Sequence, residues 1–341
     1  MILVLSILLF ILSILFKKSK VLAGVILIYS WLLFGFNTMN GDYELYERMY
    51  IESTKVESLL SYEAGYKLLM FIGNSMGLSF QDFFKLIAAI ILGLLGFVSF
   101  KYSKFPALFL SIFLIVYLPI EYVLLRNFLA FSFVLIGLVS YFNGDRKSKV
   151  ILLSMILVAT TIHISSLFYL LIYFALYYGT IKASKVFMLT IVSLLCFSIL
   201  NSIMLKLIGN VGGRESMYLT KLPQFIIYSF IQVVNYFLIF WFFNSNKKVD
   251  INVKSIIISI NLYLIFLIVI YFNYAIFIRI FLNLSIFNVL IMLNNINIKG
   301  KWGIERAIVL VFYLSFFFFE FVYPVMDDSL YPLYENNSFF K

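Results

Sequence analysis

Apolar residues occur in long runs along this chain, and short polar segments separate the runs. Many of the runs approach the roughly 20 residues that a helix needs to cross a bilayer. A helix also satisfies its own backbone hydrogen bonds, which the hydrocarbon interior requires. We therefore expect about twelve helices, over residues 2–16, 21–36, 83–100, 105–120, 125–142, 150–162, 164–179, 186–205, 224–243, 255–272, 275–294 and 303–322.

Composition supports a membrane protein. The chain has 341 residues, of which 63% are hydrophobic and 12% charged, against about 45–50% apolar and about 25% charged in soluble domains. We expect an all-α, polytopic helical bundle that forms a single transmembrane domain over residues 1–341. Cys196 stands alone, so no disulfide framework is expected, and a single histidine argues against a zinc or haem site.

The net charge of +10 does not indicate nucleic-acid binding, because the basic residues sit in short clusters between apolar runs. Alternate loops hold most of them, which places these loops in the cytoplasm. Residues 1–16 lack a basic segment before the apolar run and a cleavage site, so we expect a retained helix. Both termini are then extracytoplasmic. The basic residues of the cytoplasmic loops are Lys17, Lys18, Lys20, Lys101, Lys104, Arg146, Lys147, Lys149, Lys182, Lys185, Lys247, Lys248, Lys254, Lys299, Lys301 and Arg306.

One run is too long for a single crossing. Residues 150–179 would make a helix of about 45 Å, against a hydrocarbon core of about 30 Å. Treating it as one span would also invert the side of every later loop. A break near His163 restores the alternation and places this histidine at the extracytoplasmic tip of two short helices.

Two extracytoplasmic loops stand out. Residues 37–82 are acidic and aromatic, and their apolar part, 64–80, is interrupted by glycines. We interpret that part as an interfacial or re-entrant segment, because a full span would break the loop pattern. Residues 206–223 are glycine-rich around Arg214.

Arg126, Arg214 and Arg279 lie in or beside apolar sequence on the extracytoplasmic half. A lone guanidinium within a membrane costs about 2.5–3.5 kcal/mol unless it is paired or reaches the interface. Arginine also binds phosphate oxygens through two parallel hydrogen bonds, so three converging arginines would hold a diphosphate. The alternative is snorkelling or an internal ion pair, for example Arg126 with Glu121 or Arg279 with Glu320.

His163 could act as a general base, as its ordinary pKa is near 6.5. It could equally be a buried histidine bonded to its serine and threonine neighbours. Asp42 and Glu63 could orient or deprotonate a hydroxyl, although acids on loops are more often simply solvated. Tyrosines gather beside them and are candidate glycan contacts. No nucleotide-binding, zinc-protease or serine-hydrolase motif occurs.

The order of these residues resembles the EpsG family, a branch of the Wzy-like polysaccharide polymerases. An acidic loop with Asp-x-x-x-Tyr-x-x-x-Tyr is followed by Glu-x-Gly-Tyr, Leu-Arg-Asn, a basic hairpin and His-x-Ser-Ser. The chain departs from the family pattern at Asn127, where glutamine is more usual, and lacks a proline after Glu63. The matching residues are Asp42, Tyr46, Tyr50, Glu63, Gly65, Tyr66, Leu125, Arg126, Asn127, Ala130, His163, Ser165, Ser166, Arg214 and Arg279.

The resemblance implies an enzyme of the bacterial inner membrane that joins oligosaccharide repeat units carried on undecaprenyl diphosphate. The product would be O-antigen, capsule or exopolysaccharide, with a chain-length regulator and a flippase as partners and no nucleic acid. It implies that three arginines hold diphosphate, that His163, Asp42 or Glu63 is catalytic, and that Tyr46, Tyr50, Tyr66 and Asn127 contact glycan. No cofactor or metal is required, although a divalent ion bridging Asp42 and diphosphate is an open alternative.

Other functions fit the same features. A lipid-linked glycan flippase would also need cations in a membrane cavity, but would be expected to have pseudo-symmetric halves. A transferase that uses polyprenyl-phosphate sugars would depend on Asp42 and a metal. An O-acyltransferase could also use a membrane histidine and arginine.

Overall fold

The computed structural model describes residues 2–54, 63–145, 147–177, 222–245, 249–266, 274–296 and 301–340. Its elements in these ranges are all helices, which confirms the all-α class; an isolated bridge joins Asn37 to Asn337. The chain divides into two compact units. Unit 1 comprises Met1–Leu167, Val289–Asn295 and Leu314–Lys341, and unit 2 comprises Phe168–Asn288 and Ile296–Tyr313.

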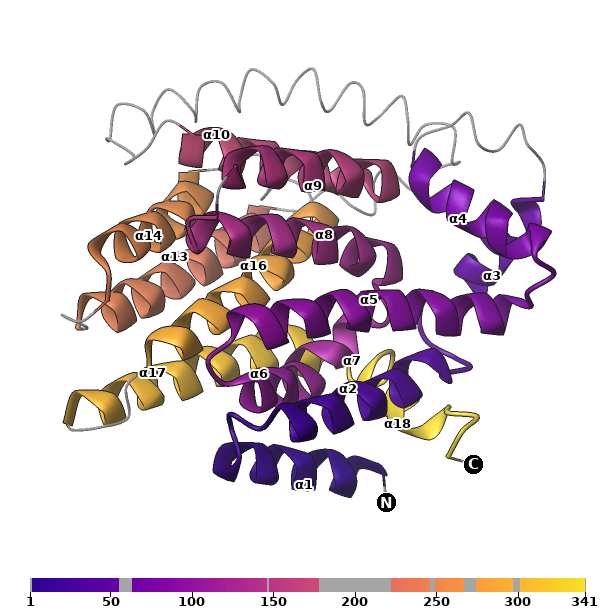
Figure 1. The fold of residues 1–341 in the computed structure, drawn as a ribbon, viewed down its shortest axis with the longest axis horizontal. Coiled ribbons are helices and arrows are strands. Elements are labelled where there is room, and N and C mark those ends of the chain that lie inside the picture. Colours follow the sequence, from indigo (N-terminus) through magenta and orange to yellow (C-terminus); the bar gives the residue numbers. More distant parts are fainter. Residues whose placement is uncertain are drawn as a thin grey trace. The chain divides into compact units, whose positions relative to one another are not determined.

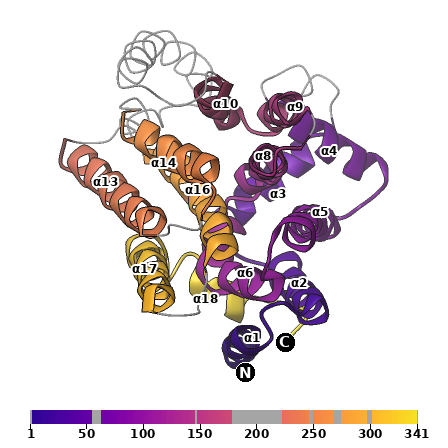
Figure 2. The same cartoon turned by 60° about the vertical axis from the view of Figure 1, so that its left-hand side comes forward.

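The first helices of unit 1 follow the apolar runs of the sequence closely. Ser19 and Ser79 each accept a hydrogen bond from a backbone N–H in the first turn of the next helix, at 3.1 and 3.2 Å, so these serines fix where two helices begin. Pro106 occupies the first turn of a third. These helices lie side by side in Figure 2: α1 (Ile2–Leu15), α2 (Lys20–Gly35), α5 (Phe80–Tyr102) and α6 (Pro106–Ile112).

A helical hairpin carries the stretch around Arg126 and His163. Helix α8 (Leu125–Phe142) packs lengthwise against α9 (Ser148–Ile162), as Figure 1 shows. The contact is close because Gly137 has no side chain: a Cβ there would lie 2.9 Å from the Leu152 Cα. Helix α9 ends at His163, whose backbone is extended. The expected break in the long apolar run is therefore confirmed.

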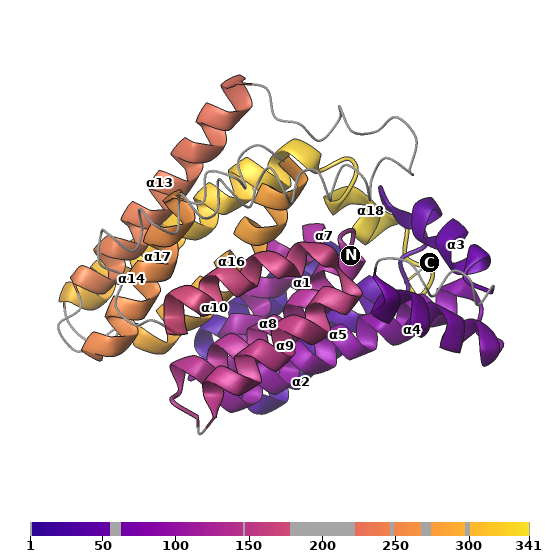
Figure 3. The ribbon, with the colours of Figure 1, turned by 90° about the horizontal axis from the view of Figure 1, so that it is seen from above.

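Residues between α2 and α5 form two short helices, α3 (Tyr43–Glu52) and α4 (Ala64–Ser75). Twelve residues give α4 a length of about 18 Å, too short for a span and in keeping with an interfacial segment. Figure 3 shows α3, α4 and the C-terminal residues at the same end of unit 1. The C-terminal segment is bonded there, since the Thr38 N–H donates to the Asn336 carbonyl at 2.8 Å and the Ser338 N–H to that of Phe36 at 2.9 Å.

Unit 1 contains two π-helical segments, which the sequence did not indicate. The expected helix over 105–120 consists of α6, a π segment (Phe113–Tyr117) and α7 (Leu118–Glu121). The last apolar run is α17 (Lys301–Phe317), followed by a π segment (Phe318–Val322), a 3-10 turn and the short helix α18 (Leu330–Glu335). Such wide turns are uncommon and frequently occur at functional sites.

Within unit 2, a buried network of asparagine side chains joins three helices. Asn261 of α14 and Asn288 of α16 exchange hydrogen bonds of 3.1 and 3.0 Å, and Asn235 of α13 donates to Asn261 at 3.2 Å. Between apolar helices in lipid, such bonds and close packing replace the hydrophobic driving force. The helices of unit 2 are α10 (Tyr169–Tyr177), α13 (Leu222–Asn244), α14 (Ile251–Phe266) and most of α16 (Tyr274–Asn295) and α17.

Five of the described helical stretches are long and apolar enough to cross a membrane: Phe80–Tyr102, Leu125–Phe142, Pro223–Asn244, Ile276–Asn295 and Gly303–Val325. Several shorter apolar helices accompany them. The twelve spans and the extracytoplasmic termini stay predictions. The expected helix over 186–205 lies outside the described residues.

Candidate functional site

The side chains of Arg126 and His163, from distant parts of unit 1, both bond to the carboxylate of Glu63. The Arg126 Nη1 donates to Glu63 Oε2 at 2.6 Å, and the His163 Nδ1 bonds to Glu63 Oε1. The backbone N–H of Ile164 donates to the same Oε1 at 3.2 Å. The side chains of Glu63 and His163 are only 5% and 7% exposed, and that of Arg126 is 18% exposed.

The environment keeps the Glu63 carboxylate ionised. Burial alone would raise its pKa, but the hydrogen bond from His163 and the charges of His163 and Arg126 lower the pKa to about 2. An ionised carboxylate only accepts hydrogen bonds, so the His163 Nδ1 must carry the proton of the shared bond. Because Glu63 holds the proton on Nδ1, the imidazolium gives up its other proton from Nε2, and that nitrogen carries the basic lone pair of the neutral form. Glu63 therefore orients the histidine and is too weak a base to replace it.

The backbone around Glu63 brings α4 against the end of α9. Glu63 has a φ of 62°, a left-handed conformation that costs energy for a residue with a side chain. Two residues later, Gly65 touches Thr161 on α9: a Cβ there would overlap the Thr161 hydroxyl and lie 3.0 Å from its carbonyl carbon. This contact lets the Glu63 side chain reach a histidine only two residues beyond Thr161.

Two aromatic rings also contact the Arg126 guanidinium. Its central carbon lies 5.5 Å from the ring centre of Tyr46 and 5.9 Å from that of Tyr66, both within range of a cation–π interaction. Burial raises the pKa of both tyrosines, and the charge of Arg126 acts against this shift. The rings therefore remain neutral phenols.

The buried positions of the tyrosines change the role expected of them. Tyr46, Tyr50 and Tyr66 are 4%, 3% and 1% exposed, and Tyr50 stacks on Phe83 at 4.7 Å. Rings this buried offer no open face to a sugar in this structure, so their geometry favours positioning Arg126 and α4. Asn127 is buried as well. Glycan contact by these residues stays a prediction.

The ion pair considered between Arg126 and Glu121 is absent. Arg126 pairs with Glu63 instead, while both carboxylate oxygens of Glu121 are buried without a hydrogen-bond partner among the described residues. The view of Glu63 as a solvated loop acid is likewise wrong, because its side chain is buried and bonds to Arg126 and His163. The one sequence signal for this burial is the short Glu-x-Gly-Tyr spacing, because its glycine, Gly65, permits the close contact with Thr161.

The other candidate residues lie elsewhere or outside the described part. Asp42 is the half-buried residue that precedes α3, one turn before Tyr46. Arg279 is half-buried on α16 in unit 2. Arg214 lies outside the described residues. The convergence of the three arginines therefore stays a prediction.

Acid should weaken the Glu63 contacts in a defined pH range. The pKa of Glu63 is about 2 in the folded protein against 4.5 for an ordinary glutamate, so its stabilisation is present above pH 4.5 and lost as the pH falls through about 2. We expect Glu63→Gln to lower the thermal unfolding midpoint at pH 7 and to flatten its decline from pH 4.5 to 2. Glu47→Gln, which alters an exposed acid of α3, should keep the wild-type decline; an equal decline in Glu63→Gln would contradict the assignment.

Comparison with known proteins gives one family. The sequence pattern of the EpsG family matches residues 20–336, which is nearly the whole chain and includes Glu63, Arg126 and His163. No curated protein and no solved structure matches the chain.

Proposed function

Because this chain belongs to the EpsG family, a Wzy-like polysaccharide polymerase family, it has a polymerase-type function, and we propose that it joins repeat units carried on undecaprenyl diphosphate. The observation that carries this proposal is the Arg126–Glu63–His163 cluster, which combines a cation for a diphosphate with an oriented base. The proposed location is the outer face of the bacterial inner membrane, with multiple spans.

In the proposed step, the non-reducing-end hydroxyl of an acceptor glycan attacks the anomeric carbon of a donor glycan. The new bond joins the hydroxyl oxygen to that carbon, and the bond from the carbon to diphosphate breaks. Undecaprenyl diphosphate leaves with the electron pair of that bond. The His163 Nε2 takes the hydroxyl proton, and Glu63 stabilises the imidazolium that forms.

Arginine carries the electrostatic part of this proposal. Negative charge builds up on the diphosphate as it leaves, and a fixed guanidinium in a site of low dielectric stabilises it strongly. Arg126 has further N–H groups beyond the one given to Glu63. Arg214 and Arg279 are proposed as additional diphosphate ligands, with Asp42 as a secondary acid of the site. We propose that no metal takes part.

Reconstitution tests this function. Purified protein in liposomes, given undecaprenyl-diphosphate-linked repeat unit in the accessible leaflet, should produce a ladder of polymer lengths, with the same ladder in the presence of a chelator. Movement of the lipid-linked glycan across the bilayer without chain growth would instead indicate a flippase. Growth that requires a divalent cation and single sugars on polyprenyl phosphate would indicate the other transferase class.

A further inference from the structure

A short helix places one of the aromatic rings that contact Arg126. Helix α3 supplies Tyr46, whose ring faces the guanidinium, but it has only ten residues. Isolated helices of this length are marginal in water, so the attachments of α3 fix where Tyr46 lies. At its far end the Tyr50 hydroxyl donates to the Leu78 carbonyl at 2.9 Å.

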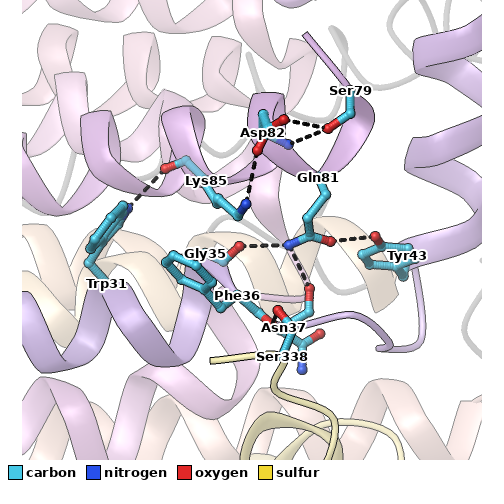
Figure 4. A network of polar contacts seen from close by, with 10 residues as sticks. All are labelled: Trp31, Gly35, Phe36, Asn37, Tyr43, Ser79, Gln81, Asp82, Lys85 and Ser338. Carbon is cyan, nitrogen blue, oxygen red and sulfur yellow. Dashed lines mark hydrogen bonds and ion pairs between the residues drawn. The ribbon is translucent and has the colours of Figure 1, made fainter. Parts of the chain in front are cut away.

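At its beginning, α3 is tied to two other helices through a single amide. The Tyr43 hydroxyl donates to Gln81 Oε1 at 2.6 Å, while Gln81 Nε2 donates to the carbonyls of Gly35 at 2.8 Å and Asn37 at 3.2 Å. Figure 4 shows this arrangement, which we call the Gln81 clasp (Gly35, Asn37, Tyr43 and Gln81). It joins the end of α2, the start of α3 and the start of α5.

The clasp satisfies groups that would otherwise lack partners. Gly35 is the last residue of α2, and the final carbonyls of a helix receive no hydrogen bond from an N–H of the same helix. The Tyr43 ring also packs edge-on against Phe80, 5.1 Å between centres. The amide of Gln81 is planar, and its oxygen bonds to α3 while its nitrogen bonds to the end of α2. It therefore sets both the distance and the orientation between these two helices.

A second branch of the same network touches only α5 and α2. Lys85 Nζ bonds to Asp82 Oδ1 at 2.9 Å, and Ser79 Oγ bonds to Asp82 Oδ2 at 2.7 Å (Figure 4). Trp31 Nε1 donates to the Lys85 carbonyl at 3.0 Å. None of these bonds reaches α3. A change in the Gln81 clasp therefore tests the attachment of α3, and a change in the second branch of α5 serves as its control.

We propose that Gln81 is a positioning residue of the site: through Tyr43 it fixes α3, and through Tyr46 it fixes the Arg126 guanidinium. The expected effect of Gln81 on turnover rests on the proposed function. The geometric part concerns Arg126 alone and holds for any substrate. Loss of the clasp lets α3 move, which uncovers one face of the guanidinium.

Chemical modification tests the geometric part without substrate. Phenylglyoxal reacts with accessible guanidinium groups, and mass spectrometry of the purified full-length protein reports the rate at Arg126. We expect Tyr43→Phe, which keeps the ring and removes one hydrogen bond, to raise this rate several-fold. Gln81→Leu should raise it further. Asp82→Asn, which removes the ion pair of the second branch and keeps Lys85 over the Phe36 ring, should leave it at the wild-type value.

Turnover tests the functional part. One hydrogen bond contributes about 0.5–1.5 kcal/mol, so Tyr43→Phe should lower kcat/KM for the lipid-linked repeat unit roughly 2- to 12-fold. In a Tyr46→Leu background the same change should have no further effect, because the path to Arg126 is already cut. Additive losses would show general loosening and overturn the proposal.

The two measurements separate the possible failures. An unchanged phenylglyoxal rate in Tyr43→Phe overturns the role of Gln81, whatever the activity. A raised rate with unchanged kcat/KM overturns its importance for turnover. If wild-type protein makes no polymer, the proposed function fails, while the modification rates still decide whether the clasp positions Arg126. Should Gln81→Leu fail to insert, Tyr43→Phe decides alone.

Discussion

Arg126→Ala is expected to collapse the surface polysaccharide from a ladder of lengths to single repeat units. Removing a fixed cation from a developing negative charge costs about 10²–10³ in rate. The change also leaves Glu63 buried with His163 as its remaining ion-pair partner among the residues that the structure describes, and breaking a buried ion pair costs about 3–5 kcal/mol. Electrophoresis of polysaccharide from a strain carrying the variant measures the outcome.

Two further variants separate chemistry from stability. Arg126→Lys keeps the charge but loses the planar fork that binds phosphate through two bonds, so we expect short polymers at reduced amounts. Arg48→Ala alters an exposed arginine of α3 whose Nε donates to the Glu44 carbonyl at 3.3 Å, and the ladder should be unchanged. A full ladder from well-inserted Arg126→Ala protein would refute the assignment of Arg126.

Gly65→Ala is expected to inactivate the enzyme without touching a charged group. The new methyl would overlap Thr161, so α4 must shift away from α9, and Glu63 moves away from His163. Overpacking of this kind costs about 1–3 kcal/mol, but a displacement of about 1 Å in a site costs about 10²-fold in rate. Polymer formation should therefore fall about 10²-fold while much of the protein still inserts and folds.

The matched control is Gly93→Ala on α5, where nothing lies within 4 Å of the added Cβ. This variant should keep wild-type activity, because alanine favours a helix. Thr161→Ala removes the hydroxyl that the methyl would overlap and should restore part of the activity of Gly65→Ala. If Thr161→Ala gives no recovery and Gly93→Ala is equally inactive, the close contact is not the cause.

The sequence allowed the helical class and the break at His163 to be predicted for simple physical reasons. A bilayer fixes the length of an apolar helix, and the alternation of basic loops fixes where a run must be divided. Both are local or additive properties of a sequence. The π-helical turns at 113–117 and 318–322 were not predictable, since they depend on how neighbouring helices pack.

Glu63, Arg126 and His163 were each named as candidates from the sequence, but their meeting in one cluster was not predicted. Glu63 lies 63 positions from Arg126 and 100 from His163, and a single sequence contains no information about such pairings. Loop acids are usually solvated, which argued against the burial that the structure reveals. The neighbouring Glu121 was the natural partner for Arg126 by proximity alone. The left-handed backbone of Glu63 and the close contact of Gly65 with Thr161 instead bring the Glu63 carboxylate to Arg126.

The C-terminal segment has a consequence for the order of events during synthesis. Asn37 and Asn336, whose groups bond at 3.2 Å, are 299 positions apart. At about 5–20 residues per second, the ribosome reaches Asn336 roughly 15–60 s after Asn37. Asn37, just beyond the end of α2, is therefore synthesised well before the residues that bond to it, and it gains these hydrogen bonds only after a further 299 residues have been made.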